Sequence, residues 1–265
     1  MEYKYSTLID YIKSYKHVAV AFSGGVDSSF LLAACKEAIG ENVIAITIDT
    51  PAIPRHELEE AKEIAKLLKI HHLIIKDDKI EESIKHNPID RCYYCKRIEF
   101  KKIIDEAKKQ GISIVFDGSN TDDNSDYRPG KKAIRELEII SPLAEMGFTK
   151  NDIRHYSKLL NLPTWDKPAY ACLYSRIPYN HEIKKSDLKK IELSEKFLID
   201  KGFRNVRVRC HDNLARIEVN PSDRIKLLSE PLATEINSTL KKFGFDYISV
   251  DIIGYRTGSF NETIL

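Results

Sequence analysis

The chain of 265 residues has little net charge and no long apolar run. Its 42 lysines and arginines nearly balance 40 aspartates and glutamates, so a formal net charge of +2 gives no case for bulk binding to nucleic acid or to a membrane surface. The longest apolar runs, such as VAVAF at 18–22, are far too short to span a bilayer, and the N-terminal segment lacks a signal-peptide core. The composition predicts a cytoplasmic protein with one large domain or two small ones.

Cysteine is also scarce. Five cysteines do not make a disulfide scaffold, and an odd number in a reducing compartment points to metal or redox use of some of them. Cys35 lies in a predicted helix and Cys210 shares a strand face with two valines, so both are expected in the core. Cys92, Cys95 and Cys172 are the cysteines left for chemistry.

The first part of the chain alternates short apolar runs with helical patterns. Predicted strands lie at 17–22, 42–48, 71–76 and 112–118, with a short one near Ile139. Predicted helices lie at 28–39, after Pro54, at 96–109 and after Thr149. This alternation predicts an α/β fold, a Rossmann-like doubly wound parallel sheet with helices on both faces.

The pattern changes after a stretch with three prolines and no clear period, residues 161–180. Beyond it the sequence predicts a helix, two short strands, further helices and a last strand, at 182–200, 204–210, 214–219, 222–242 and 246–252. We therefore expect a nucleotide-binding domain, an active-site loop or linker, and a smaller C-terminal α+β domain, at 1–165, 166–181 and 182–265.

A glycine-rich turn, SGGVDSS, joins the first predicted strand to the first predicted helix. Such a turn presents backbone N–H groups that attract anions; Gly24 and Gly25 permit close approach, and Ser23 and Ser28 add hydroxyl donors. The P-loop pattern GxxxxGK[ST] is absent, so this motif supplies no lysine for terminal phosphates. Asp27 would repel a phosphate unless Mg²⁺ lay between them. The turn predicts a site for nucleotide phosphate and metal; the alternative is a plain turn with Asp27 as a cap.

The stretch DRCYYCKR at 90–97 places a CxxC pair among basic residues, at a predicted helix start. That environment favours thiolates, which can bind zinc, bind an iron–sulfur cluster or form a redox dithiol. No second CxxC pair completes a four-cysteine zinc site, although a histidine could. Together with Cys172 in the irregular stretch, the pair would leave one iron of a 4Fe–4S cluster open to an exogenous ligand such as hydrosulfide. Alternatively, Cys172 is an isolated loop cysteine.

Charged residues in the second half form a further candidate site. Arg207 and Arg209 alternate with valines and therefore project from one strand face, roughly 7 Å apart. Arg216 and Glu218 occupy the polar face of the next strand. A cluster of arginines suits a phosphate, and the alternative is a solvated sheet face with salt bridges. Glu195 lies on an otherwise apolar helix stripe, so it is either peripheral or functional.

SGGVDSS resembles the SGGxDS signature of the PP-loop ATP pyrophosphatases. The resemblance implies an enzyme that cleaves ATP between its α and β phosphates and adenylates a substrate. In that family the turn binds the departing pyrophosphate, and adenosine lies near the positions of Thr47 to Asp49, at the end of the second strand, and of Gly118. Both positions fit a parallel sheet, which binds ligands at the carboxyl ends of its strands.

Further stretches resemble one branch of that superfamily, the LarE sulfur transferases: DGSNTDDNSDYRPG, SPLAEMGFTKNDIR, ACLYSRIPY, RVRCHDNLARIEV and GYRTGSFNE, at 117–130, 141–154, 171–179, 207–219 and 254–262. These enzymes convert carboxylates of pyridinium-3,5-dicarboxylate mononucleotide to thiocarboxylates, which build the nickel-pincer nucleotide cofactor. In one subtype the loop cysteine gives up its own sulfur. Another subtype has a CxxC pair and a 4Fe–4S cluster, and the three cysteines resemble that subtype. The chain departs from the usual small residues at Tyr174 and Asn180.

The resemblance implies an ATP-dependent sulfurtransferase that uses ATP, Mg²⁺ and a 4Fe–4S cluster. It assigns the cluster to Cys92, Cys95 and Cys172, with Mg²⁺ on Asp27. It assigns the substrate phosphate to Arg207 and Arg209, and catalytic roles to Cys172, Asp27 and Glu195. A sulfide donor and a homo-oligomer are also implied, with the C-terminal domain serving substrate binding and assembly.

The nearest rival is a 4Fe–4S tRNA thiolase of the same superfamily, for which a more basic surface is expected. An amide-forming synthetase of the NAD or GMP type would have no use for three cysteines. A zinc-stabilised nucleotide-binding module or sulfur carrier without catalysis is the alternative from another class, and turnover of ATP to AMP would exclude it.

Overall fold

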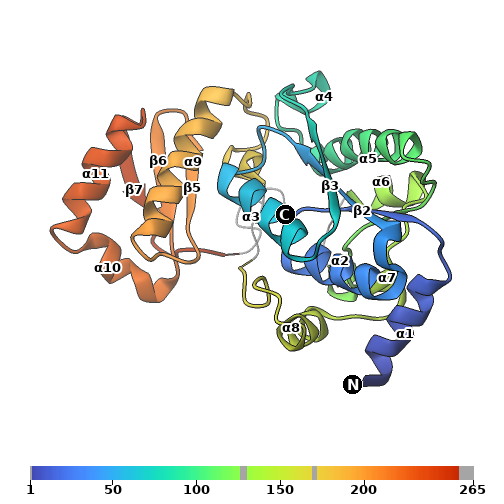
Figure 1. Ribbon diagram of the computed structural model, residues 1–265. Helices are drawn as coiled ribbons and strands as arrows, with labels where there is room; N and C mark the ends of the chain where they lie inside the picture. Colours follow the sequence, from blue (N-terminus) through green and yellow to red (C-terminus); the bar gives the residue numbers. More distant parts are fainter. Residues whose placement is uncertain (1, 126–129, 169–171, 257–265) are drawn as a thin grey trace. The chain divides into compact units, whose positions relative to one another are not determined.

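The computed structural model describes the chain except for residues 1, 126–129, 169–171 and 257–265 (Figure 1). The chain divides into two compact units, the first of Met1–Lys79 with Asp90–Tyr170 and the second of Ile80–Ile89 with Ala171–Leu265. Three of the motifs quoted above lie partly outside the described residues, at 126–129, 171 and 257–262. Residues 169–171 of the expected active-site loop lie outside them as well. No described helix is long and apolar enough to cross a membrane.

The first unit is built on a four-stranded parallel sheet with the strand order β3-β2-β1-β4. In chain order the strands are β1 (Val18–Ala21), β2 (Val43–Asp49), β3 (His71–Lys76) and β4 (Val115–Phe116). The strand expected near Ile139 is a single parallel bridge between Phe116 and Ile140. The sheet confirms the predicted α/β fold class.

Helices cover both faces of this sheet (Figure 1). In chain order they are α1 (Glu2–Lys13), α2 (Val26–Ile39), α3 (Arg55–Leu67), α5 (Arg91–Lys109), α6 (Gly130–Glu136), α7 (Pro142–Glu145) and α8 (Lys150–Leu159). Short 3₁₀ turns, η1 (Gly40–Asn42) and η2 (Thr121–Ser125), precede β2 and α6. Residues of α1, α2, α3 and α8 share one apolar cluster, and residues of α5 and α6 share the other.

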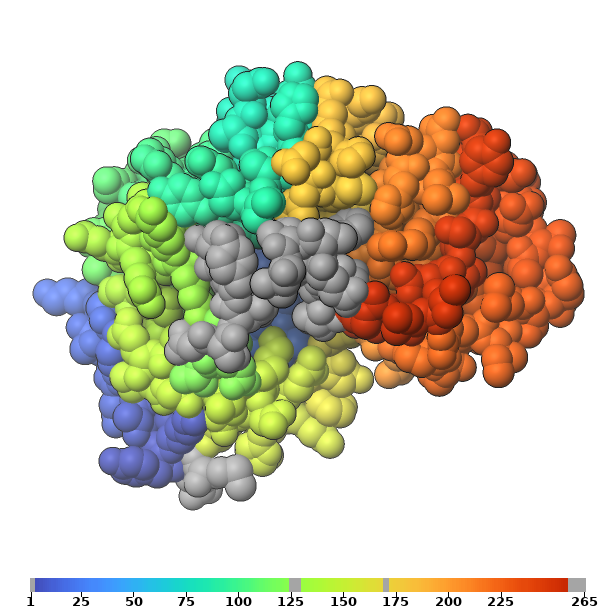
Figure 2. Space-filling view, turned by 180° about the vertical axis from the view of Figure 1, so that it is seen from behind, coloured from blue at the N-terminus to red at the C-terminus, as the bar shows by residue number. Residues whose placement is uncertain are grey.

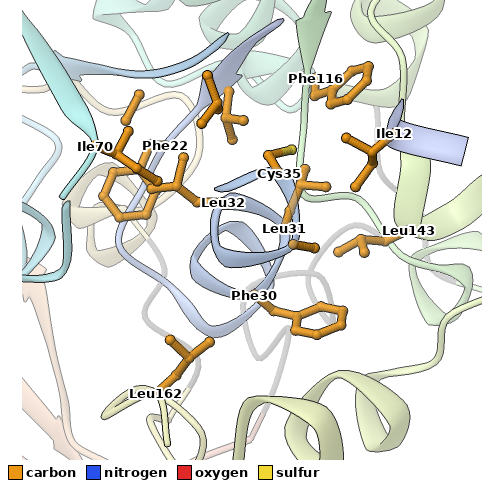
Figure 3. Packing of buried hydrophobic residues seen from close by; sticks show 14 of the residues in the cluster. Ile12, Phe22, Phe30, Leu31, Leu32, Cys35, Ile70, Phe116, Leu143 and Leu162 are labelled. Carbon is orange, nitrogen blue, oxygen red and sulfur yellow. The ribbon is translucent and has the colours of Figure 1, made fainter. Parts of the chain in front are cut away.

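Period-two alternation along the strands explains the two clusters. Val18 and Val20 of β1 pack with the α2 side, whereas Ala19 packs with α5. Both faces are covered, so β1 and β2 read as nearly continuous apolar runs in the sequence. On one face Phe30 and Cys35 of α2 lie among apolar side chains from several elements (Figure 3). Burying a large apolar side chain of this kind contributes about 1.5–3 kcal/mol.

The N-terminal helix is part of the first unit. Leu8 and Ile12 of α1 are fully buried in the main cluster. Lys4 Nζ donates to Gly147 O and to Asp152 Oδ2, each at 2.7 Å, which ties α1 to the turn before α8. In the space-filling view the blue N-terminal surface lies beside the yellow-green surface of later residues (Figure 2).

The second unit contains a three-stranded mixed sheet in the order β5-β6-β7. Its elements are α4 (Glu82–Lys85), η3 (Leu173–Arg176), α9 (Lys185–Asp200), β5 (Arg207–His211), β6 (Leu214–Glu218), η4 (Pro221–Asp223), α10 (Arg224–Leu228), α11 (Leu232–Lys242) and β7 (Tyr247–Val250). β5 and β6 are antiparallel, and β6 and β7 are parallel. The mixed sheet with its helices agrees with the small C-terminal α+β fold expected from the sequence. The unit also includes residues 80–89 and 171–181, which the sequence analysis placed outside the expected domain of 182–265.

Residues 80–89 belong to the second unit although they interrupt the first in sequence. The buried Asn87 side chain donates through Nδ2 to Ile177 O at 2.7 Å and to Pro178 O at 2.9 Å. The backbone N–H of Ile183 donates to Lys85 O at 2.7 Å. These bonds attach the α4 segment to the residues that follow η3.

Candidate functional site

The SGGVDSS turn lies at the carboxyl end of β1 and opens directly into α2, whose N-cap is Gly25. Gly24 has φ +70°, a conformation that favours glycine. A Cβ at this position would stand 2.8 Å from the Ala61 Cβ of α3, so the backbone also needs glycine for space. The turn therefore packs Gly24 against α3 and places a helix N-terminus at the carboxyl end of β1, and the helix N-terminus is what suits an anion.

Two hydroxyl groups face each other inside this turn. Ser23 Oγ lies 3.1 Å from Ser28 Oγ, and the Gly25 N–H donates to Ser23 Oγ at 3.3 Å. Ser28 Oγ donates to Gly25 O at 3.3 Å. The predicted phosphate ligands Ser23, Gly25 and Ser28 thus lie together and bond one another.

Asp27 lies in the first turn of α2 and is not the helix cap. Its Oδ2 accepts from Lys150 Nζ at 2.5 Å, while its buried Oδ1 accepts no hydrogen bond among the described residues. Lys150 is the first residue of α8, and its backbone N–H donates to Asp122 Oδ2 at 2.7 Å. One carboxylate oxygen is therefore engaged by an ammonium group, and the other is available as a cation ligand.

Two further predicted nucleotide contacts follow neighbouring strands of the same sheet. A Cβ on Gly118, just after β4, would lie 3.0 Å from the Ser28 backbone N, so Gly118 lies directly against the start of α2. Asp49 ends β2, is 8% exposed and pairs with Arg55 Nη1 at 2.5 Å. The structure thus places Gly118 beside the turn and commits the Asp49 carboxylate to an ion pair.

Thr47 of β2 lies in the stretch compared with the adenosine site. Thr47 Oγ1 donates to Phe22 O at 2.6 Å, so at 2.7 Å it accepts from His72 Nε2. Burial, followed by the nearby charges of Lys62 and His71, lowers the pKa of His72 to about 4. His72 is therefore neutral at pH 7 and serves as a hydrogen-bond donor within the sheet.

The CxxC pair lies in the first turns of α5, as the sequence predicts. Cys92 is exposed and Cys95 is partly exposed, and Arg91 Nη2 lies 3.7 Å from Cys92 Sγ. α5 packs on the sheet and leads into the parallel strand β4, so it begins on the side where the strands have their carboxyl ends. Further along α5, Lys102 Nζ donates to the carboxylate of Asp77, which follows β3 directly. Cys92 lies about 15 Å before Lys102 along the helix axis.

The other three cysteines differ sharply in exposure. Cys35 and Cys210 are buried, as expected, and Cys172 is partly exposed at the start of η3 in the second unit. Burial raises the pKa of the Cys35 thiol and raises that of Cys210 to about 11, so both are protonated at neutral pH. Among the described residues no three His, Cys, Asp or Glu side chains form a group that could hold a metal ion, and the three-cysteine cluster stays a prediction.

Arg207 and Arg209 of the second unit are buried, which excludes a solvated position for these two side chains. Arg207 and Arg209 are 4% and 6% exposed, and they stand opposite Glu218 and Arg216 in the β5–β6 ladder. Arg209 Nη2 donates to the fully buried Glu218 at 2.7 Å, and Arg216 Nη2 donates to the same carboxylate at 3.2 Å.

Arg207 has different neighbours from Arg209. Its Nη1 donates to Val206 O at 2.8 Å, and its guanidinium lies 5.2 Å from the centre of the Tyr255 ring. The Tyr255 backbone N–H donates to Val219 O at 2.8 Å. The preceding residue must be glycine, because a Cβ on Gly254 would lie 2.4 Å from the same oxygen. Burial and the neighbouring Arg176 charge lower the pKa of Arg207, although a guanidinium stays charged at neutral pH.

Glu195 is held in a buried ion pair with Arg176. Its Oε1 accepts from Arg176 Nε and from the Val208 backbone N–H, and its Oε2 accepts from Arg176 Nη2, each at 2.9 Å. Burial alone would raise the pKa of Glu195, but the Arg176 charge and hydrogen bonds lower it. Both oxygens of the predicted catalytic carboxylate are therefore already engaged.

The sequence analysis did not identify three basic residues that contact these sites. Lys150 and Lys167 contact the turn residues Asp27 and Gly24, and Arg176 neutralises Glu195. Lys150 carries a local signal, because Thr149 and Asp152 form a capping box that marks it as the first residue of a helix. Lys167 and Arg176 reach partners through long-range folding and carry no comparable signal.

A parallel sheet with this turn at the carboxyl edge defines the first unit as a PP-loop nucleotide-binding domain. Accordingly, residues 17–163 match the family model described as the Arginosuccinate synthase N-terminal HUP domain. Argininosuccinate synthase of Pyrococcus furiosus is 29% identical over 164 residues, which are 57% of this chain and 40% of that protein.

Other relatives match nearly the whole chain. An uncharacterized protein of a Synechocystis strain is 37% identical and covers 100% of this chain and 99% of that protein. Pyridinium-3,5-bisthiocarboxylic acid mononucleotide synthase of Lactiplantibacillus plantarum is 34% identical over 263 residues, which are 98% of this chain and 95% of that protein. The chain belongs to the LarE family of PP-loop proteins.

Proposed function

We propose that this protein is an ATP-dependent sulfurtransferase that inserts sulfur into carboxylates of pyridinium-3,5-dicarboxylate mononucleotide, for the nickel-pincer nucleotide cofactor. The observation that carries the proposal is the 34% identity over 98% of the chain with pyridinium-3,5-bisthiocarboxylic acid mononucleotide synthase. In the first step a carboxylate oxygen attacks the α-phosphorus of ATP and displaces pyrophosphate. In the second, a sulfide attacks the activated acyl carbon and AMP leaves.

The SGGVDSS turn is the proposed pyrophosphate site. Ser23, Gly25 and Ser28 supply backbone and hydroxyl donors, and the contact between Gly118 and Ser28 leaves no room for a Cβ. Asp27 Oδ1, with no hydrogen bond among the described residues, fits Mg²⁺, which would neutralise phosphate charge there. Lys150 supplies a second positive charge to this turn.

Cys92, Cys95 and Cys172 are the proposed ligands of a 4Fe–4S cluster. Their partial or full exposure fits this role, whereas the buried Cys35 and Cys210 do not. When bound, such a cluster would supply the sulfide for the second step. After anaerobic purification, iron and acid-labile sulfide should be present, and a change of any one of the three to alanine should lower both.

A sacrificial cysteine is the mechanism to be excluded. It predicts one sulfur transferred per chain and dehydroalanine at position 172, a mass loss of about one H₂S. The cluster mechanism predicts several turnovers with sulfide supplied and an unchanged Cys172 in the protein mass spectrum. Dehydroalanine in an iron-replete sample would refute the cluster proposal.

Arg207 and Arg209 are the proposed ligands of the substrate phosphate. Both side chains are buried, and the charge of Arg176 adds to burial in lowering the pKa of Arg207. Arginine side chains are thus close together in this unit, and a phosphate dianion would offset their positive charge. Replacing both with alanine should weaken binding of the pyridinium mononucleotide much more than binding of ATP. Equal losses for both ligands would contradict the assignment.

Asp27→Asn tests the adenylation step. With ATP, Mg²⁺, sulfide and the pyridinium substrate, this variant should form AMP and pyrophosphate at least about 100-fold more slowly, because charge stabilisation at a phosphate is lost. Asp10→Asn is the matched control, since Asp10 pairs with Lys13 on the exposed side of α1. Equal rates in Asp27→Asn and the unchanged protein would overturn the site.

The similarity to pyridinium-3,5-bisthiocarboxylic acid mononucleotide synthase over nearly the whole chain supports a pyridinium substrate over tRNA, the substrate of the alternative enzyme considered from the sequence. Competition with bulk tRNA should therefore leave AMP formation unchanged. The sulfide donor, the homo-oligomeric state and the cytoplasmic location stay predictions.

A further inference from the structure

Lys167 contacts the backbone of the phosphate turn from outside the SGGVDSS motif. Its Nζ donates to the Gly24 carbonyl oxygen at 3.2 Å and pairs with Glu60 Oε2 of α3 at 2.6 Å. The Lys167 side chain is 10% exposed, whereas that of Glu60 is 46% exposed. The ammonium group is therefore fixed between the turn and α3.

The segment that carries Lys167 is itself anchored. Arg154 of α8 donates through Nη1 to Trp165 O at 2.7 Å and through Nη2 to Lys167 O at 2.8 Å. The Lys167 backbone N–H donates to Thr164 O at 3.0 Å. The lysine stem thus starts from a backbone with a fixed position in the first unit.

The contact acts on the peptide bond between Gly24 and Gly25. In a planar trans peptide the carbonyl oxygen of one residue and the N–H of the next point in opposite directions. With glycine on both sides, no Cβ restricts rotation of this peptide plane. A bond that fixes Gly24 O therefore also fixes the direction of the Gly25 N–H, which donates to Ser23 Oγ inside the turn.

We propose that Lys167 is a positioning residue that keeps the Gly24 carbonyl turned away from a bound phosphate and the Gly25 N–H turned toward it. Rotation of the unrestrained peptide would bring a carbonyl oxygen toward an anion. The proposal rests on the proposed function of the turn as a nucleotide phosphate site. It assigns a role in that site to a side chain that need not touch the nucleotide.

The sequence offers a direct probe. Gly24–Gly25 is the single Gly-Gly step among the 11 glycines of the chain. In protein labelled with glycine carrying ¹³C at the carbonyl and ¹⁵N, only Gly25 has a ¹⁵N bonded to a ¹³C-labelled carbonyl, so an HNCO experiment selects its signal. In nucleotide-free Lys167→Met the Gly25 signal should move or split, whereas Lys167→Arg should restore it. In the ¹H–¹⁵N correlation spectrum of the same sample, which shows every labelled glycine, the signals of glycines remote from the turn should not move.

Lys62→Met is the matched control. Lys62 pairs with Glu59 at 2.6 Å on the same helix as Glu60 and is not part of the turn contact. Magnesium pyrophosphate binding should weaken by roughly tenfold in Lys167→Met and stay unchanged in Lys62→Met, since a hydrogen bond to a charged donor is lost. Lys167→Gln, neutral and shorter, gives the same readout if the methionine variant folds poorly.

An unchanged Gly25 signal in a folded Lys167 variant would overturn the proposal, whether or not pyrophosphate binding falls. A fall in binding without a change of that signal would mean that Lys167 contacts the phosphate directly. Failure of the unchanged protein to bind pyrophosphate would refute the proposed function of the turn instead. The Gly25 signal distinguishes these cases because it is measured without nucleotide.

Discussion

Replacing Glu195 with glutamine tests whether this carboxylate stabilises the second unit or takes part in the chemistry. Its two oxygens accept hydrogen bonds from Arg176 Nε, Arg176 Nη2 and the Val208 N–H, each at 2.9 Å. The Arg176 side chain is 0% exposed and that of Glu195 is 6% exposed. Glu195→Gln would leave the Arg176 charge buried without its partner.

The size of the effect follows from this burial. Removing one partner of a buried ion pair costs about 3–5 kcal/mol. Glutamine keeps the side-chain volume and one acceptor, so we take the lower end, about 3 kcal/mol. At about 1.36 kcal/mol for each factor of ten, this corresponds to a roughly 150-fold increase in the population of the opened state.

Hydrogen exchange measured by mass spectrometry is the suitable assay, because two units need not unfold together and exchange reports each locally. Peptides that cover β5 should lose about two orders of magnitude of protection in Glu195→Gln. Asp200→Asn, which breaks an exposed pair with Lys196 at the end of the same helix, should leave that protection unchanged. Loss of sulfur transfer with less than tenfold loss of protection would refute the structural role and favour a catalytic one.

Three further predictions each concern the replacement of single residues. Cys35→Ala and Cys210→Ala should retain iron and sulfur transfer while Cys92→Ala loses both, as measured by iron content and product formation; equal iron loss in all three would contradict the assignment. Gly24→Ala should abolish pyrophosphate binding in calorimetry, because φ +70° and the 2.8 Å approach to Ala61 exclude a Cβ; retained binding would refute the geometry. Although burial opposes it, hydrogen bonds from Lys4 and Thr149 lower the pKa of Asp152 from 3.8 to about 2, so its contribution to stability is full above pH 4 and is lost as the pH falls toward 2. Asp152→Asn should therefore destabilise the first unit at pH 6 more than at pH 2 in thermal melts, and an equal loss at both would contradict this.

Local pattern predicted the elements well where one feature dominated. The pattern HHLIIK at 71–76 forms β3 with the expected bounds. β3 is an edge strand, and its alternating Leu73 and Ile75 pack against one apolar cluster while Ile74 between them is more exposed. The apolar pattern marked the next helix only from residue 96, whereas α5 begins at Arg91, within the stretch that the CxxC motif placed at a helix start. Its first turns, RCYYC, expose Cys92 and bury no apolar side chain, so no apolar stripe marks them in the sequence.

The candidate site was predicted only in part, because several of its contacts join residues distant in sequence. Asp27 and Lys150 are 123 residues apart, and Gly24 and Lys167 are 143 apart. No spacing rule connects them. By contrast, the departure at Asn180 has a local reason: its φ of +63° is one that asparagine tolerates and glycine adopts freely.

The assignment of residues 80–89 to the second unit has a consequence for dissecting this protein. The chain passes from one unit to the other three times, at 79/80, 89/90 and 170/171. A version ended at residue 168 would keep the α4 segment but remove the backbone carbonyls of Ile177 and Pro178 that satisfy the buried Asn87. A single proteolytic cut near 170 would instead leave two fragments joined through these hydrogen bonds, which should co-elute under native conditions. Exchanging the second unit between relatives therefore requires moving two pieces of sequence together.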